Sequence, residues 1–197
     1  MEHYFTNNEN LRSQIRKINY KRDENSFAFF SDNGVFSKDK IDYGSTFLVD
    51  TFLKNNDKKI NNLLDVGCGY CFIGITLSKI LDCKAEMIDV NKRAIHLANM
   101  NIESNKVSAS AFESYCYENI KNKYDLIITN PPIRAGKDVV LNILEKAKDY
   151  LDKDGELWYV MRKNQGAKSI IKILNKIYKI EIIDKSKGFY VIKAKIH

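Results

Sequence analysis

The sequence has few of the residues that mark several large classes of protein. Only 2 of its 197 residues are proline, and 44% are hydrophobic. That balance excludes a collagen-like or disordered polymer and leaves enough apolar side chains for one domain with a full core. The chain also contains no internal repeat, low-complexity tract or linker that would separate domains.

Long apolar runs are missing as well. The first residues, MEHYFTNNENLRSQ, hold no stretch that suits a signal peptide. The apolar stretches further on fall far short of the roughly 20 residues that cross a membrane. We therefore expect a cytoplasmic protein that has no membrane partner.

Cysteine and histidine are scarce. A domain of this size needs no disulfide staples, so we expect its four cysteines to be free thiols. Cys68 and Cys71 form a CxxC, but no second CxxC or neighbouring pair of histidines completes a zinc site, and we predict no metal. A redox CxxC stays open as an alternative, because such motifs also stand at helix starts. The three histidines form no recognisable catalytic arrangement.

The charge balance is basic. Lysine and arginine number 32 against 25 acidic residues, which gives a formal net charge of +7. Clustered cations bind phosphates by releasing counterions, so this balance suggests a polyanionic partner. The bias of an AT-rich genome explains the charge equally well, because lysine, asparagine and isoleucine are abundant throughout the chain.

Apolar runs and helical periodicities alternate from residue 59 onward. The expected strands are 59–67, 83–90, 106–112, 124–130, 156–162 and two within 179–196, which are joined at Lys187 and Gly188. The expected helices are 71–81, 91–104 with Asn91 as its cap, 137–151 and 166–178. Such alternation predicts an α/β fold: a mostly parallel seven-stranded sheet with helices on both faces and a C-terminal antiparallel hairpin.

The first 45 residues break this rhythm. The segment SFAFFSDNGVFS (26–37) has a DNG turn signal between apolar runs and predicts a small β hairpin, and 44–56 predicts a helix that leads into the core. We expect an N-terminal extension over 1–45, with a possible contact to substrate, and the main domain over 46–197.

Two motifs at the ends of predicted strands favour a cofactor that contains adenosine. Ligands of open α/β sheets bind beyond the carboxyl ends of the strands. Gly67 and Gly69 follow the first strand of the main domain, where glycine allows positive φ and a close approach of backbone to ligand. Asp89 closes the next strand and could accept hydrogen bonds from both hydroxyls of a ribose. The alternative for Asp89 is a helix cap.

The motif Asn130-Pro131-Pro132 follows the apolar strand 124–130. Two prolines cannot continue a sheet, and they hold the chain in a fixed extended turn. The side-chain oxygen of Asn130 and the carbonyl of Pro131 then converge on one point. Two such acceptors suit a planar NH₂ group, which they orient and whose positive charge they stabilise when it attacks an electrophile. A bare structural turn is the alternative.

Together these motifs resemble the class I S-adenosylmethionine-dependent methyltransferases that act on amino groups. More narrowly, the chain resembles the single-domain form of the small-subunit (16S) ribosomal RNA guanine N2-methyltransferase family. The strings that occur in family order are GVFSKDKIDYGSTFL (34–48), LLDVGCGYCFIGI (63–75), IDVNKRAIHLANMN (88–101), NPPIRAGK (130–137), GELWYVMRKNQGAKS (155–169) and KGFYVIKA (187–194). The resemblance implies a Rossmann-like methyltransferase fold, a ribosomal RNA or small-subunit partner, and a monomer or homodimer.

The resemblance also implies roles for single residues. Asn130 and Pro131 would be catalytic. The cofactor-binding residues would be Phe36, Gly44, Ser45, Thr46, Asp65, Gly67, Cys68, Gly69, Asp89, Val90 and Asn130. The substrate-binding residues would be Pro132, Ile133, Arg134, Lys137, Arg162, Lys163 and Lys168.

The chain departs from the family pattern at three places. Ile133 stands where many amino methyltransferases have an aromatic residue that stacks on the base. Ser114 and Tyr115 stand where an acidic residue usually receives the adenine amino group, so Glu113 is a candidate substitute. Cys71 replaces the third glycine of the cofactor loop, and we hypothesise that it tightens the pocket slightly.

Other functions share the NPP motif. It also marks methylation of adenine N6 in RNA or DNA, and of a glutamine side-chain amide (N5) in release factors. From another class, the chain could be a non-catalytic RNA-binding module that retained the fold. Intact Asp65, Asp89 and Asn130 argue against that alternative.

Overall fold

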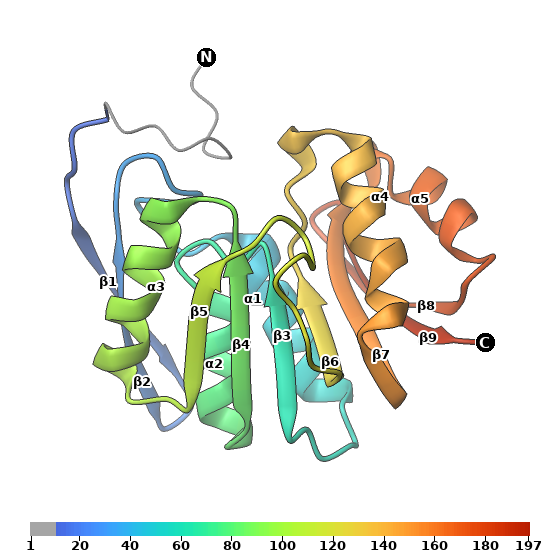
Figure 1. The fold of residues 1–197 in the computed structure, drawn as a ribbon, viewed down its shortest axis with the longest axis horizontal. Coiled ribbons are helices and arrows are strands. Elements are labelled where there is room, and N and C mark those ends of the chain that lie inside the picture. The colour runs from blue at the N-terminus through green and yellow to red at the C-terminus, as the bar shows by residue number, and fades with distance from the viewer. Residues whose placement is uncertain (1–10) are drawn as a thin grey trace.

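The computed structural model describes residues 11–197, which fold around a seven-stranded sheet with the strand order β5-β4-β3-β6-β7-β9-β8 (Figure 1). Strands β3 to β7 are parallel, while β9 pairs antiparallel with both β7 and β8. The strands are β3 (Asn62–Val66), β4 (Lys84–Asp89), β5 (Ala109–Glu113), β6 (Tyr124–Thr129), β7 (Leu151–Arg162), β8 (Tyr178–Ser186) and β9 (Phe189–Ile196). The predicted α/β fold is confirmed, with its C-terminal hairpin turning at Lys187 and Gly188.

Helices cover both faces of the sheet. Their bounds are α1 (Tyr43–Asn55), α2 (Phe72–Leu81), α3 (Lys92–Asn105), α4 (Lys137–Lys146) and α5 (Ala167–Leu174), with short 3-10 helices η1 (Ile133–Ala135), η2 (Ala147–Asp149) and η3 (Lys163–Gln165). Buried side chains of α1, α2 and α3 belong to one core, and those of α4 and α5 to the other. Within residues 11–197, no helix has the length and apolar character that crossing a membrane requires.

Neighbouring residues of the central strands point into opposite cores. Leu63 packs into the core under α1 to α3, while Leu64 packs into the core under α4 and α5, because side chains alternate along a strand. Trp158 is fully buried, meets Phe52 edge-on at 5.0 Å between ring centroids, and donates to Glu156 Oε2 at 2.8 Å. A sheet buried on both faces explains why its strands read as continuous apolar runs.

A separate hairpin, β1 (Arg16–Arg22) and β2 (Asn25–Ser31), lies beside α3 (Figure 1). The predicted hairpin exists, but its predicted position over 26–37 is wrong. The chain turns at Asp23 and Glu24, and the DNG segment follows the end of β2. Asp32 of that segment accepts hydrogen bonds from Ser13 Oγ and Gln14 N, so the turn signal folds back onto the preceding segment.

Two asparagines of α3 satisfy the outer edge of β2. Asn101 accepts from Phe30 N at 2.6 Å and donates to Phe30 O at 3.0 Å. Asn105 makes the same pair of contacts with Ala28, at 3.1 and 2.8 Å. Asn101 and Asn105 are four residues apart and therefore lie on one face of α3. Their side-chain amides bond to the backbone of β2 as a neighbouring strand would. Asn101 also donates to Tyr70 O at 2.9 Å, which ties the hairpin to the loop before α2.

The predicted helix over 137–151 is too long. Helix α4 ends at Lys146, and β7 already begins at Leu151. The pair Asp154-Gly155 lies inside β7, at the place where the pairing register between β6 and β7 shifts. A Cβ on Gly155 would lie 2.7 Å from Tyr124 O, so only glycine fits this irregularity.

Candidate active site

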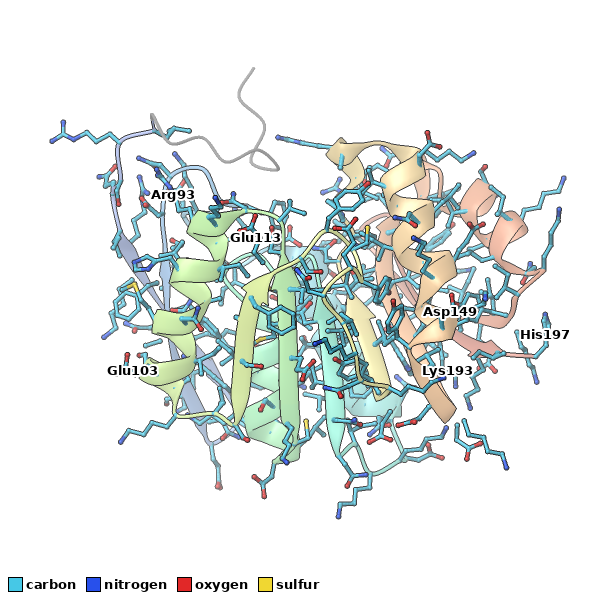
Figure 2. The ribbon with its side chains drawn as sticks, in the orientation of Figure 1. Arg93, Glu103, Glu113, Asp149, Lys193 and His197 are labelled. Atoms are coloured by element: carbon cyan, nitrogen blue, oxygen red, sulfur yellow. The ribbon has the colours of Figure 1, made fainter. Side chains whose placement is uncertain are left out.

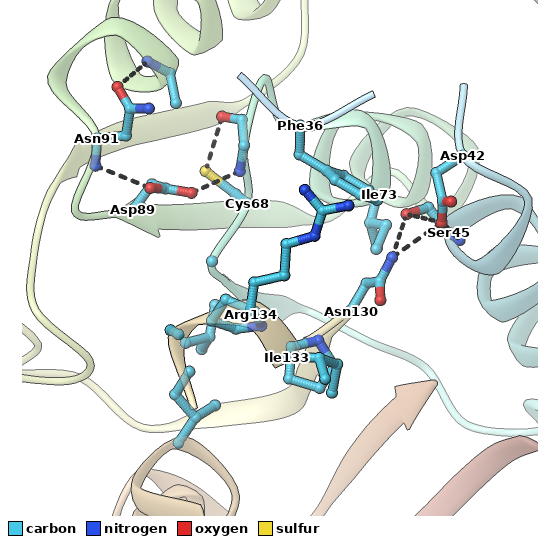
Figure 3. Close-up of a pocket in the computed structure, with 18 of the residues that line it drawn as sticks. Phe36, Asp42, Ser45, Cys68, Ile73, Asp89, Asn91, Asn130, Ile133 and Arg134 are labelled. Atoms are coloured by element: carbon cyan, nitrogen blue, oxygen red, sulfur yellow. Dashed lines mark hydrogen bonds between the residues drawn. The ribbon is translucent and has the colours of Figure 1, made fainter. Parts of the chain in front are cut away.

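A cavity of about 540 Å³ opens at the carboxyl ends of β3, β4 and β6 (Figure 3). Its wall combines the glycine loop after β3, the end of β4, the NPP loop after β6 and residues 35–37. Figure 3 shows Arg134 reaching from the NPP loop toward Phe36. The predicted site residues that line the cavity are Phe36, Ser45, Gly67, Cys68, Gly69, Asp89, Val90, Asn130, Pro131, Pro132, Ile133, Arg134 and Arg162.

The other predicted site residues lie outside this wall. Thr46 donates its hydroxyl to Asp42 O at 3.1 Å, within the first turn of α1. Gly44 leaves room for its neighbours, because a Cβ there would lie 2.9 Å from both Asp42 Oδ2 and the ring of Phe189. Asp65 is buried behind the loop, and Lys137, Lys163 and Lys168 lie further along the surface.

The glycine loop is anchored on β4. Gly67 N and Cys68 N both donate to Ile88 O, at 2.8 and 3.0 Å, and Gly69 N donates to Asp89 Oδ2 at 2.9 Å. Gly67 and Gly69 have φ of 69° and 56°, a region that strains other residues. Nothing lies within 4 Å of the position of a Cβ on Gly69. The loop therefore presents bare backbone to the cavity.

Two carboxylates adjoin this loop: Asp65 is fully buried behind it, and Asp89 lines the cavity. Asp89 Oδ1 accepts from Asn91 N at 2.9 Å, and burial raises the pKa of Asp89. Asp65 Oδ2 accepts from Gly74 N at 2.9 Å, but Oδ1 has no hydrogen-bond partner among residues 11–197. Burial, with the negative charge of Asp89 adding to it, raises the pKa of Asp65 from 3.8 to about 7. This end of the cavity therefore suits a ligand with hydroxyl or cationic groups.

Asn130 follows β6 and is held by residues at the start of α1 (Figure 3). Its Nδ2 donates to Asp42 Oδ2 at 3.0 Å and to Ser45 Oγ at 2.9 Å. The neighbouring carbonyl of Pro131 accepts from Ile133 N at 2.8 Å, which leaves one of its two lone pairs. The amide oxygen of Asn130 thus remains as the acceptor available to a ligand in the cavity.

Sequence reasoning gave no role to many residues of the cavity wall, and four of them bear on its chemistry: Asp42, Tyr115, Cys116 and Phe189. Asp42 is the most consequential, and its signal is the DxxS spacing of a helix N-cap, which Ser45 N completes by donating to Asp42 Oδ2 at 2.9 Å. Tyr115, with 48% of its surface exposed, and Cys116 line the cavity after β5, whereas Glu113 does not. The fourth is Phe189, for which the sequence gives no local signal.

A second, basic hollow adjoins the cavity. Arg162 lines both, and its guanidinium lies 4.3 Å from the centroid of the Phe189 ring. The hollow is completed by Lys163, Asn164, Lys168, Lys187 and Gly188. Lys137 lies nearby on α4 and donates to Ser169 Oγ at 3.3 Å. Four cationic side chains around one hollow suit an anionic ligand.

The CxxC lies inside this site without the features of a reactive pair. Cys71 is fully buried in the core and does not line the cavity, so the structure gives no support to the hypothesis that it tightens the pocket. Its Sγ lies 2.8 Å from Cys68 Sγ, and burial raises the pKa of both thiols. Raised pKa values leave little thiolate, the reactive form. In the described part of the chain, no three or more His, Cys, Asp or Glu side chains are grouped as metal ligands.

The two described histidines are remote from the cavity. His197 lies at the C-terminal end beyond β9, where its Nε2 is 3.0 Å from Asn175 O (Figure 2). His96 is exposed on α3. Arg93, which Figure 2 labels near the start of the same helix, donates to Asn33 O and Leu11 O at 3.0 and 2.6 Å. Among the described residues, no histidine lines the cavity.

A glycine loop, a strand-terminal acid and an NPP turn thus surround one cavity at the carboxyl ends of parallel strands, and these are the features that resemble the class I methyltransferases. Residues 26–193 match the family model of the methyltransferase small domain. The chain therefore belongs to that family, and it is an S-adenosylmethionine-dependent methyltransferase, as the sequence predicted.

Individual relatives narrow the comparison. The chain is 41% identical to the protein YbxB of Bacillus subtilis over 98% of both chains. It is 33% identical to ribosomal RNA small subunit methyltransferase C of Vibrio parahaemolyticus, over 87% of this chain and 50% of that one. The fold matches the Thermus thermophilus 16S rRNA N2 G1207 methyltransferase, solved with AdoMet and guanosine, with a TM-score of 0.84 and 20% identity over 95% of this chain and 52% of that one. The chain thus spans about half the length of these two ribosomal RNA methyltransferases.

Proposed function

We propose that this protein transfers a methyl group from S-adenosylmethionine to the exocyclic amino group (N2) of a guanine in 16S ribosomal RNA, in the cytoplasm. The observation that carries the proposal is the orientation of Asn130: both N–H bonds of its amide are engaged, so its oxygen is free to accept from an NH₂ group. The relatives named as small-subunit ribosomal RNA methyltransferases favour that RNA as the substrate, and the Thermus thermophilus neighbour, which is named for N2 of a guanine, favours guanine over other amino acceptors.

The cavity fits the cofactor in size and chemistry. Pockets for ligands of this class usually measure about 300 to 1,000 Å³, and this one measures about 540 Å³. Gly67 and Gly69 would border the methionine and ribose, and Asp89 would accept from the ribose hydroxyls. Val90, Tyr115 and Cys116 would flank the adenine, because they line the cavity past the ends of β4 and β5. The bound cofactor supplies an activated methyl group on a sulfonium.

The residues of this chain then act by positioning. Asn130 Oδ1 accepts one N–H of the guanine amino group, and the remaining lone pair of the Pro131 carbonyl accepts the other. These contacts would hold the amino group in one orientation and would stabilise the positive charge that grows on its nitrogen. Ile133 packs against the base edge, and the aromatic rings of Phe36 and Phe189 are the cavity's candidates for stacking. A guanine in a helical region has to be unstacked before it enters.

The adjoining hollow would hold the RNA backbone. Arg162 lines both the cavity and the hollow, and Lys163 and Lys168 line the hollow, so these three cations would contact the strand that carries the target guanine. Replacing Lys163 and Lys168 with alanine is expected to weaken RNA binding and to lower the slope of log affinity against log salt by about 1 for each lysine–phosphate pair that the substitutions remove. Lys153, exposed at the opposite end of β7, is the matched control, and an equal effect of Lys153→Ala would refute this placement.

Radiolabelled S-adenosylmethionine tests the function directly. The acceptors are naked 16S rRNA, assembled small subunits, DNA and a release factor, and mass spectrometry identifies the modified nucleoside. We expect N2-methylguanosine in one of the two ribosomal samples. Asn130→Ala is expected to abolish transfer and to leave calorimetric cofactor binding largely intact. Label that appears only in DNA or only in protein would refute the guanine assignment, and no label with no cofactor binding would favour a non-catalytic RNA-binding module.

A further inference from the structure

The amide of Asn130 is fixed from a segment far away in sequence. Asp42 and Ser45 stand 88 and 85 residues before it, and both accept hydrogen bonds from its Nδ2. A side-chain amide carries only two N–H bonds, so these contacts engage its whole donor capacity. The oxygen of the amide consequently faces the opposite way, into the cavity that Asn130 lines.

The identity of the two acceptors decides this orientation. The two ends of an amide have nearly the same size, and only hydrogen bonding distinguishes them. An ionised carboxylate accepts and never donates, so Asp42 admits the NH₂ end of Asn130 and repels the oxygen end. Ser45 reinforces the choice, because its hydroxyl lies 3.4 Å from Asp42 Oδ2 and can donate there while it accepts from Asn130.

We propose that Asp42, supported by Ser45, is a positioning residue that locks the amide oxygen of Asn130 toward the acceptor nitrogen and so restricts the enzyme to acceptors that donate N–H. This inference rests on the proposed function only in that the acceptor is an amino group. If the amide of Asn130 were flipped, its NH₂ group would face the amino group of the substrate, and two donors cannot form a hydrogen bond with each other. Gly44 leaves room for this arrangement, because a Cβ at that position would lie 2.9 Å from Asp42 Oδ2.

Asp42 is also the N-cap of α1, and the test has to separate its two roles. Asp42→Asn retains the cap, because the oxygen of the new amide still accepts from Ser45 N and asparagine caps helices as well as aspartate does. The new amide can also present either end to Asn130, so Asn130 no longer faces a group that can only accept. Asp50→Asn is the matched control: it is the same substitution on the same helix, at a carboxylate that pairs with Arg22 on the surface.

The first measurement needs neither substrate nor cofactor. In ¹⁵N-labelled protein, the side-chain NH₂ signal of Asn130 is assigned by its disappearance in Asn130→Ala, and its exchange with solvent is followed by NMR. We expect slow exchange in the parent and in Asp50→Asn, and exchange at least about tenfold faster in Asp42→Asn, because an engaged donor exchanges only when its hydrogen bonds open. Equal rates in the parent and Asp42→Asn would overturn the proposal.

The second measurement uses whichever acceptor takes label from the parent. Asp42→Asn is expected to lower kcat about 10- to 100-fold, the size of effect that misplaced reacting groups produce. The melting temperature and the cofactor Kd should stay at the parent values, and Ser45→Ala should show a smaller fall. An unchanged kcat, or a change in KM alone, would overturn the positioning role. If label enters adenine or glutamine, the guanine assignment fails while the exchange measurement still decides the role of Asp42.

Discussion

Replacing Asp65 with asparagine is expected to destabilise the protein at acidic pH and to stabilise it at alkaline pH. The carboxyl is fully buried, with one oxygen bonded to Gly74 N and the other without a partner in the described structure. Burial, together with the charge of Asp89, raises the pKa of Asp65 from 3.8 to about 7. In the window between these values, the unfolded chain has lost the proton that the folded protein keeps, so the free energy of unfolding falls as the pH rises.

The magnitude follows from the shift. Each pKa unit corresponds to about 1.4 kcal/mol, so a rise from 3.8 to about 7 costs the cofactor-free protein roughly 4 kcal/mol above neutral pH. Asparagine removes that cost and retains the bond from Gly74 N. Its NH₂ group takes the place of the unpartnered oxygen, at a cost of about 1 to 3 kcal/mol. The variant should therefore be more stable than the parent by about 1 to 3 kcal/mol at pH 8, and less stable by a similar amount at pH 4.

Urea unfolding of the cofactor-free protein between pH 4 and pH 8 measures this difference. Subtracting the parent from the variant isolates the contribution of Asp65, which already includes the effect of the neighbouring charge of Asp89. Asp154→Asn, the same substitution at an exposed position in β7, is the control for the effect of the substitution itself. A constant difference between Asp65→Asn and the parent would refute the burial argument.

Substitutions at two further positions test the local geometry. Gly155→Ala is expected to lower the free energy of unfolding by about 1 to 3 kcal/mol, because its Cβ would lie 2.7 Å from Tyr124 O in rigid backbone; Lys153→Ala is the control, and an unchanged urea midpoint would contradict the clash. At Cys71, whose φ is 67°, glycine is expected to be more stable than alanine by about 1 kcal/mol, since both lose the buried thiol and only glycine relieves the backbone strain. Both variants should bind S-adenosylmethionine with the parent's affinity, because Cys71 does not line the cavity; a large loss of affinity in calorimetry would contradict this.

The loops that hold the predicted site residues could be predicted because each is marked by residues that are adjacent in the sequence. Gly67, Asp89 and Asn130 stand directly after apolar runs, and the carboxyl ends of parallel strands share one edge of a sheet, so knowing the strands brings the loops together. The cap of α3 was equally local: Asn91 Oδ1 accepts from Arg93 N and Ala94 N, at 3.0 and 3.3 Å, as the helix pattern predicted.

The errors arose where one local pattern fits two tertiary outcomes. Asp32-Asn33-Gly34 has the residues of a hairpin turn, but the carboxylate of Asp32 finds its partners in Ser13 and Gln14 rather than across a turn. The helical spacing of 137–151 continues past Lys146, but Tyr150 O accepts from Tyr124 N, and that pairing draws the chain into β7. The periodicity of apolar residues carries no information about a hydrogen bond to a strand much earlier in the chain.

The start of α1 shows why the full site could not be read from the sequence. Asp42 and Ser45 form an ordinary N-cap, and the cap geometry holds whether or not anything lies in front of the helix. Only the packing of α1 against the sheet places that carboxylate 3.0 Å from Asn130 Nδ2. Asp42 Oδ2 then accepts from the start of α1 and from the NPP loop, so a shift of either element disturbs both contacts. The stability of the first turn of α1 and the orientation of the Asn130 amide are therefore linked. Variants that weaken the Asp42 cap should lose activity before they unfold.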